Sequence, residues 1–151
     1  MKVLVVYDSL YGNTTQIARA IGDTVAGETD VLGVGEAKPT ELRSYDLVVV
    51  GSPTQGGRST EAIRAFLARV PALNGVSVAA FDTRLKVRWV KIFHYAASKI
   101  ADELKELGAT LAAEPEGFVV EGKKGPLVSG ELERAAAWGR NLLASSADWY
   151  R

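Results

Sequence analysis

Short apolar runs alternate along the chain with segments whose apolar residues recur every three or four positions. The runs at residues 3–7, 47–50 and 76–81 are rich in valine, as is typical of strands buried on both faces of a parallel sheet. Two further, shorter strands are predicted at residues 29–34 and 117–121. The pattern therefore indicates a sheet whose central strands are covered on both sides.

The segments between these runs have the spacing of amphipathic helices. Their apolar faces consist of four groups: Ile17, Ile21 and Val25; Ile63, Phe66, Leu67 and Val70; Ile100, Leu104 and Leu107; and Leu132, Ala135, Ala136, Gly139, Leu142 and Leu143. Pro71 and Gly108 are placed to end the second and third helices, and Ser129 to cap the fourth. Residues 35–45 lack this spacing, so we expect a loop there with one helical turn.

This order of elements predicts an α/β fold. We expect a single domain over residues 1–151, with a parallel sheet, right-handed crossovers and helices on both faces. Ligands bind such sheets beyond the carboxyl ends of the strands. Functional residues are therefore expected at residues 8–14, at residues 52–59 and from residue 82 onward.

The loop after the first predicted strand, residues 8–14, reads DSLYGNT and leads directly into a helix. Ser9, Asn13 and Thr14 supply side-chain hydrogen-bond donors, Gly12 permits tight backbone curvature, and the helix start adds backbone N–H groups. The loop contains no Lys or Arg, unlike a P-loop that binds a polyphosphate. The composition favours a single terminal phosphate held by neutral dipoles.

The strand–S-x-Y-G-N-T–helix pattern resembles the phosphate loop of flavodoxins and related FMN-binding flavoproteins. The segment GSPTQGG at residues 51–57 resembles their second flavin loop, and the resemblance continues through FDTR at residues 81–84 to the last helix. It implies a three-layer sandwich with a five-stranded parallel sheet of order 2-1-3-4-5. It also implies non-covalently bound FMN and electron transfer to a redox partner protein or a small-molecule acceptor.

By this resemblance, Ser9, Tyr11, Gly12, Asn13 and Thr14 contact the flavin phosphate, and Pro53, Thr54, Gln55, Gly56 and Gly57 line the isoalloxazine ring. Leu10, Asp82, Thr83, Arg84 and Trp89 are further candidates for FMN binding in the first and third loops. The third loop departs from ordinary flavodoxins, where acidic residues and a Tyr stacked on the ring are expected, and Trp89 fits a place at the ring edge or in the core equally well. Asp8 and Asp82 can each cap a helix or place a carboxylate near the flavin. The Gly56-Gly57 pair can form a tight turn or present a carbonyl to N5 of the reduced flavin. The sequence identifies no catalytic residue and no metal site.

Eighteen basic and eighteen acidic residues cancel to a net charge of zero. This balance argues against a nucleic-acid partner, and it differs from the acidic surface of ordinary flavodoxin carriers. Locally, Arg84, Lys86, Arg88 and Lys91 surround Trp89. The basic 84–91 loop could stabilise an anionic reduced flavin, dock an acidic partner, contact membrane headgroups peripherally, or simply be a solvated helix start.

Two other functions stay open, and with them the question of whether the chain is an enzyme. One is an FMN-dependent oxidoreductase of the quinone reductase type; the other is a flavodoxin-like interaction domain without cofactor. The absence of cysteine, of a membrane-spanning apolar run and of a signal-peptide pattern leads us to expect a cytoplasmic protein. The oligomeric state is left open.

Overall fold

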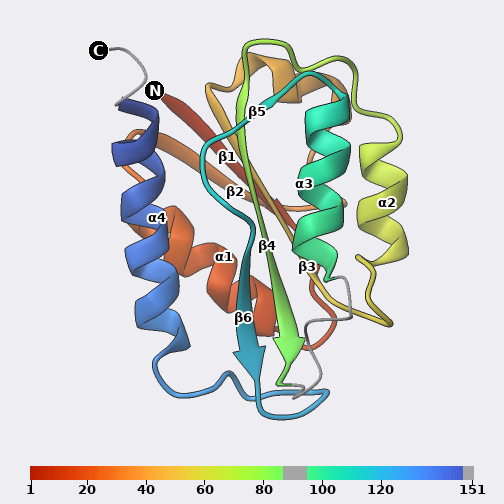
Figure 1. Cartoon of the computed structure of the whole chain (residues 1–151), viewed down its shortest axis with the longest axis vertical. Coiled ribbons are helices and arrows are strands. Elements are labelled where there is room, and N and C mark those ends of the chain that lie inside the picture. Colours follow the sequence, from red (N-terminus) through yellow and green to blue (C-terminus); the bar gives the residue numbers. More distant parts are fainter. Residues whose placement is uncertain (87–94, 148–151) are drawn as a thin grey trace.

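The computed structural model describes residues 1–86 and 95–147 of the chain. Strands and helices alternate along it as the apolar pattern predicts (Figure 1). The elements are β1 (Lys2–Tyr7), α1 (Asn13–Thr24), β2 (Glu28–Gly33), a 3₁₀ helix η1 (Pro39–Ser44), β3 (Leu47–Pro53), α2 (Glu61–Leu67), β4 (Ser77–Leu85), α3 (Ala96–Glu106), β5 (Thr110–Leu111), β6 (Glu116–Val120) and α4 (Glu131–Ala147). The turn expected within residues 35–45 is η1.

The strands form one parallel sheet in the order β2-β1-β3-β4-β5, and β6 also pairs with β4. The predicted order 2-1-3-4-5 is confirmed, but the fifth position is shared by two strands. β5 pairs with the start of β4 at Ser77–Val78, and β6 pairs with its end at Phe81–Leu85. Pro115 lies between β5 and β6 and has no N–H to donate, so it interrupts the ladder.

Side chains of the central strands alternate between two buried clusters. Val3 and Val5 of β1 join the cluster that contains residues of α1 and α4, whereas Leu4 and Val6 join the cluster that contains residues of α2 and α3. Figure 1 shows these two helix pairs on opposite sides of the sheet. The fold is therefore the expected three-layer sandwich, and its central strands are covered on both faces.

The α1 and α4 helices pack closely because α4 carries a glycine where they meet. A Cβ atom at Gly139 would lie 2.9 Å from the carbonyl oxygen of Ile21. The start of α4 differs from the expectation: the helix begins at Glu131, so Gly130, with φ of +92°, occupies the N-cap position instead of Ser129. Among the described residues, no helix is long and apolar enough to cross a bilayer.

Candidate functional site

A cleft of about 370 Å³ opens beyond the carboxyl ends of the central strands, where ligands bind to sheets of this type. It is lined by Leu10, Tyr11, Asn13, Thr14, Pro53, Thr54, Gln55, Gly56, Thr83, Arg84, Leu85, Val120 and Lys123. The first ten belong to the set inferred from sequence. The last three were not in that set. Leu85 lies at the end of β4, within the stretch expected to carry functional residues, but it was not named. Val120 and Lys123 were missed because nothing in the sequence indicated that β6 and the segment after it would border the same cleft.

The other inferred residues lie beside the cleft or outside the described chain. Ser9, Gly12 and Gly57 adjoin cleft-lining residues in the chain, and Asp82 is buried beneath Arg84. Trp89 lies outside the described residues, as does most of the basic 84–91 loop.

The first loop is curved by Gly12, which has φ of +91° and precedes the first residue of α1. Ser9 Oγ accepts the Gly12 N–H at 3.0 Å, and Asp8 Oδ1 accepts the Ser9 N–H at 2.9 Å. Asp8 thus fixes the loop backbone and caps no helix. Gly12 has no side chain that could cap α1, so the first amides of this helix are available to an anion.

The second loop is a two-residue hairpin after β3. The backbone groups of Gln55 and Arg58 exchange hydrogen bonds of 2.8 and 3.0 Å, and both central residues have positive φ, +55° at Gly56 and +77° at Gly57. This is the geometry that tight hairpin turns require of glycine pairs. The structure therefore contains the tight turn, and a carbonyl contact to flavin N5 stays a prediction.

Two buried hydroxyls join the first loop to the end of β4. Thr14 Oγ1 lies 2.9 Å from Thr83 Oγ1, and the two residues are 1% and 5% exposed. The Thr54 N–H donates to the Thr83 carbonyl oxygen at 2.8 Å, which connects the second loop to the same strand. Thr83, which lines the cleft, thus connects both loops through hydrogen bonds.

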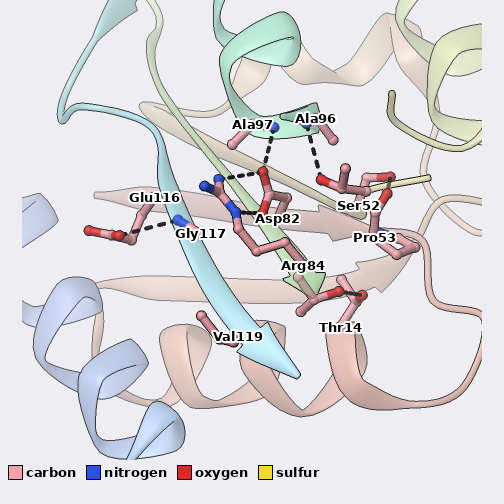
Figure 2. Close-up of polar contacts among 12 residues, drawn as sticks. Thr14, Ser52, Pro53, Asp82, Arg84, Ala96, Ala97, Glu116, Gly117 and Val119 are labelled. Carbon is pink, nitrogen blue, oxygen red and sulfur yellow. Dashed lines mark hydrogen bonds and ion pairs between the residues drawn. The ribbon is translucent and has the colours of Figure 1, made fainter. Parts of the chain in front are cut away.

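The buried Asp82 carboxylate at the end of β4 bonds to two elements. It receives two hydrogen bonds of 2.7 Å from Arg84 and one of 3.0 Å from the Ala97 N–H in the first turn of α3 (Figure 2). The structure therefore contains the helix-capping contact of Asp82, and a role of its carboxylate near the flavin stays a prediction. Burial raises the pKa of Asp82, while the Arg84 guanidinium and the Ala97 N–H oppose that rise. Arg84 also stacks on Tyr95, with its Cζ 3.5 Å from the ring centroid.

Residues 119–128 form a hairpin that borders the cleft, here called the 119–128 hairpin. The Val128 N–H donates to the Val119 carbonyl, the Glu121 N–H to the Pro126 carbonyl, and the Gly125 N–H to the Gly122 carbonyl, each at 2.9 Å. Lys123 and Lys124 are the two central residues of the turn. The base is held by Glu131, which accepts the Val119 N–H at 2.7 Å and pairs with Arg134 at 2.8 Å.

The hydrogen bond from Arg134 is the main cause that lowers the pKa of Glu131. A lowered folded-state pKa means that this interaction stabilises the protein above the unfolded value of about 4.5 and is lost as pH falls through the folded value. We expect Glu131→Gln to reduce the free energy of unfolding by about 2 kcal/mol at pH 7 and by much less at pH 3, in urea denaturation.

Glu133→Gln is the matched control, because Glu133 is exposed in the same turn of α4. A Glu131→Gln effect of equal size at both pH values would contradict the role given to the carboxylate.

Comparisons with known proteins agree with this architecture. The family model described as Flavodoxin matches residues 5–138. Oxidised flavodoxin 1 from Bacillus cereus superposes with a TM-score of 0.78 at 18% identity, covering 95% of this chain and 98% of that one. A flavodoxin from the domain Archaea gives 0.79 at 24% identity, covering 95% and 97%.

A curated relative, the NAD(P)H dehydrogenase (quinone) of Acidovorax ebreus, is 36% identical over 111 residues, covering 54% of this chain and 56% of the relative. The chain spans about half the length of the curated relatives of this name that it matches. The family model, in contrast, extends over nearly the whole sheet and its loops. The chain therefore belongs to the flavodoxin family of flavin-binding electron-transfer proteins.

Proposed function

We propose that the cleft binds one FMN non-covalently, and that the chain carries electrons to a redox partner protein or a small-molecule acceptor. The observation that carries this proposal is the continuity of the cleft. One cavity of about 370 Å³ joins the neutral loop at the start of α1 to the glycine hairpin after β3. When bound, FMN would supply one- and two-electron redox chemistry, and the protein would position it and control access to it.

The exposed apolar side chains around the cleft support a planar aromatic ligand. Among the described residues, the exposed large hydrophobic side chains are Met1, Leu10, Tyr11, Leu85 and Leu132, with exposed fractions of 40–52%. Leu10, Tyr11 and Leu85 all line the cleft. Exposed apolar groups gathered at one cavity mark a binding site, because a ligand that covers them removes their surface from water.

The polar residues of the first loop are proposed to hold the phosphate. Thr14 supplies a hydroxyl and a first-turn amide, Asn13 supplies an amide side chain, and Gly12 supplies the curvature. No catalytic acid or base is needed for binding or outer-sphere electron transfer. The residues of the second loop and of the end of β4 are proposed to surround the ring.

Titration with FMN should change flavin fluorescence and saturate at one FMN per chain. Thr14→Val, which removes a buried hydroxyl at nearly constant volume, should weaken FMN binding about tenfold, or about 1.4 kcal/mol. Riboflavin, which lacks the phosphate, should bind the original protein and Thr14→Val equally.

Thr110→Val is the control, because Thr110 is exposed in β5, which pairs with the opposite end of β4. Unaltered fluorescence at saturating FMN would refute the proposal and favour an interaction domain without cofactor.

A second candidate function is an FMN-dependent NAD(P)H:quinone reductase. It is supported by the 36% identity to the quinone dehydrogenase of Acidovorax ebreus and by the zero net charge of the chain. Stopped-flow mixing of the FMN-loaded protein with NADH or NADPH separates the two. Rapid bleaching of the flavin, followed by reoxidation with a quinone, would identify a reductase, whereas a carrier would be reduced only through a partner.

A further inference from the structure

The tip of the 119–128 hairpin lies against the start of α1. A Cβ atom at Gly125 would be 2.6 Å from Oδ1 of Asn13, so the glycine permits the hairpin backbone to pack directly on the Asn13 side chain. Gly125 has φ of +101°, a conformation that favours glycine. Together with the Glu131 bond at its base, this contact fixes the hairpin at both ends. The turn residues are therefore held beside the first loop.

Lys123 brings a positive charge to the cleft. Of the described residues, those that line the cleft include two cationic ones, Arg84 and Lys123, and no Asp or Glu. Arg84 donates to the Asp82 carboxylate through both Nε and Nη2, so the charge of Arg84 is compensated. Within residues 1–86 and 95–147, the ion pairs include none that involves Lys123.

The positive charge of Lys123 complements the first loop, which has none. Residues 9–14 contain no Lys or Arg, so an anion bound there would meet only neutral polar groups and the start of α1. Lys123 shares the cleft wall with Asn13 and Thr14 of this loop. An ammonium group beside a phosphate in a partly enclosed cleft strengthens binding more than one in open water, because screening is weaker there.

We infer that Lys123 is a phosphate-binding residue, whose ammonium complements the neutral loop at residues 9–14 and selects flavins that carry a terminal phosphate. This inference rests on the proposed function. Lys124 occupies the next position of the same turn. Both lysines are exposed, but of the two only Lys123 lines the cleft. The chain thus offers a matched pair of exposed lysines, of which one borders the proposed binding site.

The test measures dissociation constants for FMN and riboflavin by fluorescence, at low and high salt, with the full chain. Lys123→Gln should weaken FMN binding about tenfold at low salt and less at high salt, because salt screens the lost attraction. Riboflavin binding should stay unchanged. Lys123→Arg should retain FMN binding, and Lys124→Gln should behave as the unsubstituted protein.

Two results would overturn the inference while leaving the proposed function standing. The first is an equal effect of Lys123→Gln and Lys124→Gln on FMN binding, which would indicate that both lysines act only through the overall positive potential of the surface. The second is an equal loss of FMN and riboflavin affinity in Lys123→Gln, which would place the lysine against the ring system. If the unsubstituted protein binds no FMN, both the proposed function and this inference are overturned.

Discussion

Asp82→Ala is expected to lower the free energy of unfolding by about 3 kcal/mol, because it breaks a buried ion pair and leaves its partners without an acceptor. The Asp82 side chain is fully buried and receives hydrogen bonds from Arg84 and from the Ala97 N–H. Removing it leaves a guanidinium that is 21% exposed and an Ala97 N–H without its acceptor, while Thr54 Oγ1 still accepts the Ala96 N–H at the start of α3. The same change should release Arg84 from the wall of the cleft.

Urea denaturation monitored by circular dichroism measures the effect, with Asp102→Ala as the control. Asp102 also pairs with a cation on α3, Lys105 at 3.6 Å, but the two side chains are 70% and 52% exposed. Exposed pairs of this kind contribute less than about 1 kcal/mol. If the two alanine variants lose similar stability, burial is not what makes the Asp82 pair important.

The apolar pattern was sufficient to predict the sheet and its helices because each central strand is buried on two faces. A run such as residues 47–50 can bury all of its side chains only between two helical layers. These side chains indeed divide between the two core clusters. The division of the fifth sheet position between β5 and β6 was not predicted. It depends on Pro115, which interrupts the hydrogen-bond ladder with β4. That effect is evident only once β5 and β6 are known to pair with the same strand.

The cleft was predictable where polar residues directly follow strands in the sequence. The carboxyl ends of β1, β3 and β4 and the residues that follow them supplied ten of the lining residues of the cleft. Lys123 could not be found this way, because its place depends on a contact between Gly125 and Asn13, which are far apart in the chain. Whether Asp82 caps a helix likewise depended on where α3 begins.

The second large effect is expected at Gly51 in β3. A Cβ atom there would lie 2.0 to 2.5 Å from three ring carbons of Phe81, which is fully buried. The ring cannot move aside freely, because Phe118 and Trp138 pack against it edge-on with centroids at 6.2 and 6.3 Å. Gly51→Ala should therefore destabilise the protein by about 3 kcal/mol through overpacking.

Without the steric conflict, the same substitution would stabilise the protein. Replacing glycine by alanine restricts the unfolded chain and raises the free energy of unfolding by about 0.4–1 kcal/mol. Gly35→Ala is the control: a Cβ there meets no atom within 4 Å, so we expect a small effect on stability or a gain.

A double-mutant cycle with Phe81→Leu locates the cause of the Gly51→Ala effect, because the smaller side chain makes room at Gly51. Gly51→Ala should then cost at least about 1 kcal/mol less than in the original background. An equal cost in both backgrounds would show that the β3 backbone, and not the Phe81 ring, requires glycine.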